Sequence, residues 1–348
     1  MVQNRESRWW TGEEYARRYP IAESDKALDT LFEVFNDNWL KEILDRCVNK
    51  KGPSHPLVEH LVARGLHPLV ILVELGRDVQ EAKLLKNFDH MVKELRDPSK
   101  FIAAWLELEL AAHCIRTGYS VELYPQIRGK MPDLKLRFDG EDVFVEIKES
   151  HPSKIERACL ETSTILLPEV TPVLEQGLSI EITLGGLPSE PQVAILREKI
   201  SKQLAEPKPQ ALLIGSLRVW VRIEKKDSAS FSVVPSQEIA VSELIRLTRS
   251  IKHEAKQIPS SESGLIILDA GCLQGYSDRE IISAVEKTFL KYKLPNIVEV
   301  TIVRSYKFYK LEKETEVIMV PNPNYKGNIS IQKLDGILSF SRTRKLIP

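Results

Sequence analysis

Two carboxylates and a lysine stand close together in the segment "MPDLKLRFDGEDVFVEIKES", which spans residues 131–150. Asp133 precedes one short run of alternating apolar residues, and Glu146 and Lys148 lie within the next. Carboxylate oxygens are the ligands that a hard divalent cation prefers, and a neighbouring lysine could orient water or neutralise charge that develops on a phosphate. These residue types therefore point to metal-assisted hydrolysis, if the fold brings the three side chains together.

A β-hairpin that would do so is predicted by Asp139-Gly140, a dipeptide typical of tight turns between strands. A two-residue loop there pairs Leu136 with Val143. The same register sets Asp133 opposite Glu146, and a four-residue loop would keep every side chain on the same face. The apolar face would carry Leu134, Leu136, Phe138, Val143, Val145 and Ile147, and the polar face Asp133, Lys135, Arg137, Phe144, Glu146 and Lys148.

Like charges that face each other destabilise a sheet, so the acidic pair conflicts with a purely structural role. The alternative is an ordinary solvated face, on which Lys135 and Arg137 balance the acids. The Glu-x-Lys spacing alone does not decide between them, because it also begins at Glu81, Glu206, Glu224 and Glu254.

The segment upstream of the hairpin predicts a helix over residues 99–118, "SKFIAAWLELELAAHCIRTG". Ser99 is the expected N-cap, and Gly118 is expected to end the helix at the C′ position. A short strand, "YSVELY", follows. The helix carries two acids, Glu107 and Glu109, which lie about 200° apart around its axis, so that only one of them can face a given site.

In this order, the helix, the strand, Pro132-Asp133, the turn and Glu146-Ile147-Lys148 resemble the PD-(D/E)xK nuclease superfamily, which has the restriction-endonuclease-like fold. Both motifs match that pattern without substitution. The resemblance covers residues 99–150 and implies a metal-dependent site in which Asp133, Glu146 and one helix acid bind Mg²⁺ or Mn²⁺. Lys148 would complete the catalytic set.

The helix acid is the one position that the resemblance leaves open. By its spacing to Gly118, Glu107 looks like the acid of the archaeal Holliday-junction resolvases, and Glu109 is the alternative. The expected catalytic residues are therefore Glu107, Asp133, Glu146 and Lys148, of which the three acids are the expected metal ligands.

The activity that the resemblance implies is hydrolysis of phosphodiester bonds in nucleic acid, with DNA the favoured substrate. Many enzymes of this type cut two strands as dimers, so a homodimer is compatible with the reading. A catalytically inactive or partner-dependent protein of the same fold, acting as a nucleic-acid-binding or assembly module, is the alternative. An unrelated hydrolase finds little support, because the sequence has no G-x-S-x-G, Walker A or H-E-x-x-H motif.

The pattern of the whole chain predicts an α/β protein with a mixed sheet, of the α+β type. Residues 1–98 read as a helical N-terminal region, and residues 99–348 as the nuclease-like core with further α/β elements. The next helix and strand of that core are either 155–167 with 178–184 or 245–258 with 264–270. The second choice is favoured, and it makes about 152–236 an insertion. Lys256 and Gln257 would then line the cleft.

The charges of the chain balance, with 49 Lys and Arg against 49 Asp and Glu. This argues against a surface coated with positive charge for indiscriminate nucleic-acid binding, but it is compatible with a local basic groove. The candidates for such contacts are Arg128, Lys130, His151 and Lys154.

The remaining composition is that of an ordinary globular protein, with 43% hydrophobic residues among 348. The four cysteines are far apart and form no C-x-x-C pair, so neither a zinc site nor a disulfide framework is expected. No stretch is long and apolar enough for a membrane span, and the N-terminus lacks the apolar centre of a signal peptide. A cytoplasmic protein that does not contact membranes is therefore expected.

Overall fold

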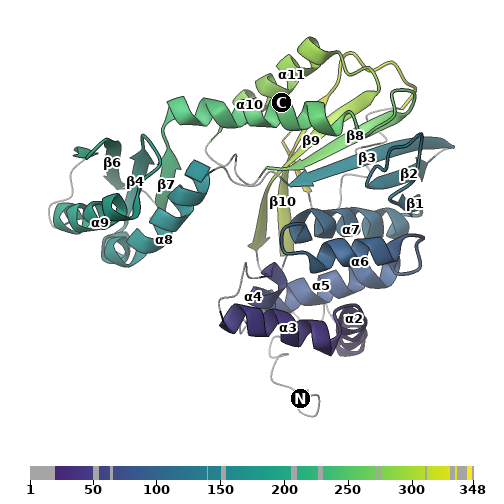
Figure 1. Cartoon of the computed structure of the whole chain (residues 1–348), viewed down its shortest axis with the longest axis horizontal. Helices are drawn as coiled ribbons and strands as arrows, with labels where there is room; N and C mark the ends of the chain where they lie inside the picture. Colours follow the sequence, from purple (N-terminus) through teal and green to yellow (C-terminus); the bar gives the residue numbers. More distant parts are fainter. Residues whose placement is uncertain are drawn as a thin grey trace. The chain divides into compact units, whose positions relative to one another are not determined.

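The computed structural model describes residues 20–49, 55–62, 66–138, 140–149, 154–204, 210–225, 230–270, 273, 276–309, 312–329, 334 and 343–346 (Figure 1). The chain divides into two compact units. The first consists of residues 1–149, 250–270 and 285–348, and the second of residues 150–249 and 271–284. Both combine helices with a mixed sheet, as the sequence predicts for the fold class.

The first unit begins with a layer of helices. They are α2 (Ile21–Val34), α3 (Asp37–Val48), α4 (Pro56–Val62), α5 (Leu66–Ala82), α6 (Phe88–Arg96) and α7 (Phe101–Arg116). Figure 1 shows α5, α6 and α7 stacked beside one another, with α7 next to the sheet. The helical N-terminal region thus packs into the same compact unit as the predicted core.

Helix α7 is apolar around most of its circumference, as expected of a helix buried on several sides. It ends as predicted, because Gly118 adopts φ +87° and the N–H groups of Gly118 and Tyr119 donate to the carbonyls of Ile115 and Cys114. Its start differs from the prediction. Ser99 is not the N-cap, since its N–H and hydroxyl both donate to the Asp97 carboxylate and the helix begins two residues later.

A sheet of seven strands follows, in the order β1-β2-β3-β8-β9-β10-β11. Neighbouring strands are antiparallel from β1 to β3 and parallel from β3 through β8 to β9. At the other end of the sheet, β10 is antiparallel to β9, and β11 is parallel to β10. The bounds are β1 Ser120–Leu123, β2 Leu134–Phe138, β3 Glu141–Glu149, β8 Ser263–Asp269, β9 Ile297–Tyr309, β10 Glu312–Pro321 and β11 Thr343–Leu346.

The β2–β3 hairpin has the register predicted from the Asp-Gly turn, with Leu136 paired to Val143 and Leu134 paired to Val145. The expectation that Asp133 pairs with Glu146 in the ladder is wrong in detail. Strand β2 begins one residue later, and Asp133 lies in the bend before it.

The strand that continues the sheet beyond β3 is β8, in parallel register, with Glu146 next to Ile266. This confirms the second of the two alternatives for the next strand. Helix α10 (Gln237–Glu254) leads into β8, and the boundary between the two units falls within this helix. A parallel connection needs a long crossover, which residues 150–262 provide.

One hydrophobic core joins the helices to the sheet in the first unit. It includes side chains of α2, α5, α6 and α7 and, from the sheet, Leu134, Leu136, Val143, Val145 and Ile147, which all lie on the predicted apolar face of the hairpin. Helix α2 approaches α5 closely at Gly76, where an added Cβ would lie 2.3 Å from the carbonyl oxygen of Ala27.

The second unit is a four-stranded sheet, in the order β5-β6-β4-β7, with helices α8 and α9 packed on it. Burial alternates along β6 from Leu217 to Glu224, so one face of this strand contacts the core and the other is exposed. The elements are α8 Lys154–Leu174, β4 Leu178–Leu184, α9 Glu190–Leu204, β5 Gln210–Ile214, β6 Leu217–Lys225 and β7 Phe231–Pro235. Helix α11 (Asp278–Tyr292) begins in this unit and ends in the first.

Candidate active site

Asp133 is fixed by hydrogen bonds to two neighbouring segments. Its carboxylate Oδ2 accepts from the main-chain N–H of Ile147 in β3 at 2.7 Å. Its main-chain carbonyl accepts from the N–H of Tyr124, just beyond β1, at 2.8 Å. The side chain is half-buried. Asp133 therefore lies beside the part of β3 that carries the Glu-x-Lys motif.

Glu146 is a buried carboxylate, with 4% of its surface exposed. Its Oε1 atom is buried and has no hydrogen-bond partner within the part of the chain that the structure describes. Burial, together with the charges of Asp133, Glu254 and Glu107, raises the pKa of Glu146 to about 10, and the positive charge of Lys130 opposes this rise. An unpartnered buried carboxyl oxygen is unusual, because leaving such a group unpaired costs free energy.

Glu107 of α7 belongs to the same cluster. Its Oε2 atom accepts a hydrogen bond from the Tyr124 hydroxyl at 2.7 Å. Burial and the nearby charge of Asp133 raise the pKa of Glu107 well above its ordinary value. The side chain thus lies near Asp133, as the spacing of the motif predicts.

The charge of the alternative helix acid, Glu109, affects a different buried acid, Asp78. Burial, followed by the charge of Glu109, raises the pKa of Asp78 in α5 to about 8. Asp78 in turn accepts a hydrogen bond from Arg116 at 2.9 Å. The two helix acids therefore face different neighbours, as their separation around α7 predicts, and Glu107 is the one beside the hairpin acids.

Lys148 is exposed and lies two residues after Glu146 on β3. Its positive charge counteracts the effect of burial on Asp133, whose pKa is nevertheless raised to about 7. Burial is the largest cause of that rise, and the negative charge of Glu254 contributes, whereas the hydrogen bond from Ile147 opposes it. The four residues predicted from the motif thus lie in one electrostatically connected cluster.

Glu254, near the end of α10, is an acid of this cluster that the sequence did not single out. It is 7% exposed, and its charge raises the pKa of both Asp133 and Glu146. The Glu254-Ala-Lys256 segment was visible only as a chance repeat of the Glu-x-Lys spacing. Of the two residues expected to line the cleft, Lys256 is exposed and Gln257 is half-buried.

Lys130 supplies a second positive charge, held in place by a tight turn. The residues at the tip, Arg128 and Gly129, have φ values of +51° and +76°, and the main chains of Ile127 and Lys130 exchange two hydrogen bonds. The ammonium group of Lys130 donates to the carbonyl of Ile258 at 2.9 Å. This tether fixes a cation of the predicted basic loop near enough to Glu146 for its charge to act on that carboxyl group.

The other predicted basic contacts are distributed differently. Arg128 donates a hydrogen bond to the Ser261 hydroxyl and lies 3.8 Å from the Glu262 carboxylate. Lys154 belongs to the second unit, and His151 lies outside the described residues. Lys130 is thus the predicted basic residue whose charge acts on the acidic cluster.

The chemistry of the donor set fits a hard divalent cation, because three buried acids and the half-buried Asp133 offer only oxygen ligands. The unpartnered oxygen of Glu146 and the mutual repulsion of the acids point the same way. The arrangement itself is not a finished coordination shell. Within the described ranges, no three His, Cys, Asp or Glu side chains are already grouped so that they could hold one ion. A bound cation would therefore require at least one of these side chains to move.

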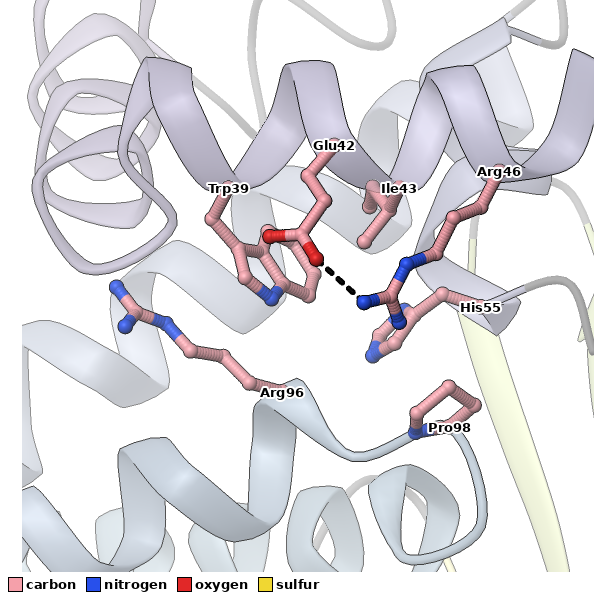
Figure 2. A pocket seen from close by; sticks show the side chains of 7 residues that line it. All are labelled: Trp39, Glu42, Ile43, Arg46, His55, Arg96 and Pro98. Atoms are coloured by element: carbon pink, nitrogen blue, oxygen red, sulfur yellow. Dashed lines mark hydrogen bonds and ion pairs between the residues drawn. The ribbon is translucent and has the colours of Figure 1, made fainter. Parts of the chain in front are cut away.

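A separate small pocket lies among the N-terminal helices (Figure 2), lined by Trp39, Glu42, Ile43, Arg46, His55, Arg96 and Pro98. Both ring nitrogens of its histidine, His55, already have hydrogen-bond partners. One accepts from the N–H of Leu57, and the other lies 3.0 Å from the carbonyl oxygen of Leu95. Arg46 and Glu42 pair with each other across its rim. We assign no chemistry to this pocket.

Among the helices that the structure describes, none is long and apolar enough to cross a membrane. The chain matches no protein-family model. It also matches none of the curated proteins and none of the solved structures with which it was compared.

Proposed function

We propose that this chain is a metal-dependent nuclease that hydrolyses phosphodiester bonds of nucleic acid, with DNA the favoured substrate and the cytoplasm the expected location. The observation that supports this most strongly is the buried side chain of Glu146. One of its oxygens has no hydrogen-bond partner among the described residues, and the charges of three further acids and of Lys130 act on it. A core that needed only stability would not assemble such a group, because repulsion and desolvation both oppose it.

In this proposal Glu107, Asp133 and Glu146 hold Mg²⁺ or Mn²⁺. When bound, such an ion polarises the scissile phosphate and lowers the pKa of a coordinated water. The protein supplies the rest of the environment. The hydrogen bond from Ile147 orients the Asp133 carboxylate, and burial keeps bulk water away from Glu146.

The two lysines have separate tasks in the proposed reaction. Lys148 is exposed and close enough to Asp133 to act on its charge, so it can orient the attacking water or neutralise charge on the phosphate. Lys130 is tethered to Ile258 and can contact a phosphate of the substrate backbone.

A second candidate is a nucleic-acid-binding or assembly module that does not cut, or that cuts only with a partner. One observation favours it: Glu107 and Asp133 each accept a hydrogen bond from the protein itself, which occupies one oxygen of both carboxylates. Such bonds would stabilise the acids in the absence of any cation.

A cleavage assay distinguishes the two candidates. The panel is duplex, single-stranded and branched DNA and RNA, each with Mg²⁺, Mn²⁺ or a chelator. Wild type is compared with Asp133→Asn and Lys148→Ala. The matched control is Asp142→Asn, because Asp142 lies on the same hairpin but pairs with Lys135 and Arg137.

Metal-dependent cutting that the first two variants lose and the control keeps supports the nuclease. Cutting that survives in Asp133→Asn and Lys148→Ala would contradict this site. Binding of nucleic acid without metal and without cutting would favour the second candidate.

A further inference from the structure

Tyr124 occupies an unusual position directly after β1. Its φ is +48°, in the left-handed region that a bulky aromatic residue rarely adopts. Its side chain is nevertheless buried, with 4% of its surface exposed. A residue held in a costly backbone conformation inside the core indicates that the surrounding structure fixes it there.

The contacts that fix Tyr124 come from two directions. The side-chain amide of Asn87 donates to the carbonyls of Leu123, at 2.9 Å, and of Tyr124, at 3.4 Å. On the other side, the main-chain N–H of Tyr124 donates to the carbonyl of Asp133. The ring also meets the imidazole of His90 edge-on, with 4.3 Å between the ring centroids. Both the backbone and the ring of Tyr124 are therefore constrained.

The hydroxyl of Tyr124 has one hydrogen and two neighbours that could accept it. Glu107 Oε2 lies at 2.7 Å, and the sulfur of Met91 lies at 3.6 Å. A carboxylate is the stronger acceptor, and the shorter distance agrees with this assignment. Tyr124 thus binds Glu107 through its side chain and Asp133 through its backbone, although these acids come from different elements.

From this arrangement we infer that Tyr124 is the positioning residue of the acidic site. It holds Glu107 and the Asp133 segment in one fixed relation, and it leaves Oε1 of Glu107 as the oxygen available to a cation. The inference rests on the proposed metal-dependent function and assigns a role to a residue that the motif does not contain. Residues that orient metal ligands typically contribute 10- to 100-fold to metal affinity.

The test is a calorimetric titration of the full chain with Mn²⁺. Tyr124→Phe keeps the ring and removes only the hydroxyl. The matched control is Tyr292→Phe, because the ring of Tyr292 contacts the ammonium groups of Lys252 and Lys291 through its face and no described acid needs its hydroxyl. Asn87→Gly is a second variant, since glycine accepts the φ of +67° found there but lacks the amide.

We expect Tyr124→Phe to bind Mn²⁺ about 10- to 100-fold more weakly than wild type. Asn87→Gly should change the affinity in the same direction, and Tyr292→Phe should not change it. The melting temperature of Tyr124→Phe should fall only modestly, because one buried hydrogen bond is lost and the ring stays in place. Unchanged Mn²⁺ affinity in Tyr124→Phe would overturn the positioning role and leave the proposed function intact. Absence of Mn²⁺ binding by wild type itself would overturn both.

Discussion

The side-chain carboxylate of Asp133 accepts a hydrogen bond from the main-chain N–H of Ile147, at 2.7 Å. Ile147 is the middle residue of the Glu-x-Lys motif, so this bond fixes the acid beside the two residues with which it would act. The bond also separates two properties of Asp133 that substitutions can test individually, namely its capacity to accept a hydrogen bond and its charge.

Asparagine and alanine at position 133 should therefore differ in stability but not in activity. Asp133→Asn keeps an oxygen that can accept from Ile147, whereas Asp133→Ala leaves that N–H unpaired. We expect Asp133→Ala to lower the free energy of unfolding by about 1–3 kcal/mol relative to Asp133→Asn. Both variants should lose metal-dependent cleavage about 100-fold or more, because both lack the charge. Urea unfolding with a chelator present, alongside the cleavage assay, measures the two effects, and equal stability of the variants would argue against the bond.

The stability of the metal-free chain should depend on pH through Glu146. Its pKa in the folded state is raised to about 10, so the folded state holds a proton that the unfolded state releases near the ordinary pKa of glutamic acid. The contribution is fully present below that ordinary value and is lost as the pH rises toward the folded value. Between pH 5 and pH 7 we expect the free energy of unfolding to fall by about 2 kcal/mol from this group.

Glu146→Gln is the variant that checks the assignment of this pH dependence. Glutamine cannot ionise, so the decline between pH 5 and pH 7 should become smaller by about the same amount. Denaturant unfolding at several pH values, with a chelator throughout, gives the two curves. Parallel curves for wild type and variant would show that another group causes the dependence.

Glu254 should contribute to the site although it lies on a separate helix and outside the motif. Its charge acts on Asp133 and Glu146, so Glu254→Gln removes repulsion from the metal-free cluster and negative charge from the proposed cation site. We expect the variant to be at least as stable as wild type without metal and to need about 10-fold more Mg²⁺ for half-maximal cleavage. Glu286→Gln, at an exposed position of α11, is the control, and an unchanged Mg²⁺ requirement would exclude Glu254 from the site.

Gly76 should be essential to the packing of α2 against α5. Alanine in the interior of a helix ordinarily stabilises relative to glycine, but here the added Cβ would lie 2.3 Å from the carbonyl oxygen of Ala27. We expect Gly76→Ala to lower the free energy of unfolding by about 1–3 kcal/mol. Gly186→Ala is the matched control, because the nearest atom to its added Cβ is 3.7 Å away and the change should stay within about 0.5 kcal/mol. Thermal unfolding of both variants decides the question, and a stabilised Gly76→Ala would contradict the close approach.

Local sequence signals predicted those parts of the site that local geometry determines. The Asp139-Gly140 dipeptide predicted the register of the hairpin, because the two-residue loop that is typical of this dipeptide fixes which residues pair. Gly118 gave the end of α7, because a left-handed residue is needed there. Ser99 was assigned wrongly as a cap, since Asp97 competes for its N–H and hydroxyl.

The residues that were missed depend on contacts between distant parts of the chain. Glu254 meets the hairpin acids only because β8 pairs with β3, and no local pattern reports that pairing. Tyr124 looks like an ordinary strand residue in the sequence, and its role arises from a backbone conformation that Asn87 and Asp133 impose. Burial is equally hidden from the sequence, because the polar face of the hairpin predicted Glu146 either at a metal site or on a solvated surface, and neither alternative included its burial.

The parallel pairing of β3 with β8 also bears on the order in which the chain can fold. The hairpin with Asp133 and Glu146 leaves the ribosome well before β8, because residues 150–262 must be synthesised in between. Contacts of such large sequence separation form slowly, since the loop must close before the pairing stabilises it. During this interval β3 has β2 on one side but lacks β8 on the other, so that Glu146 is without the strand that covers it in the folded chain. We therefore expect the desolvation of Glu146 to come late in folding, after β8 and the end of α10 have been added, when other contacts can offset its cost.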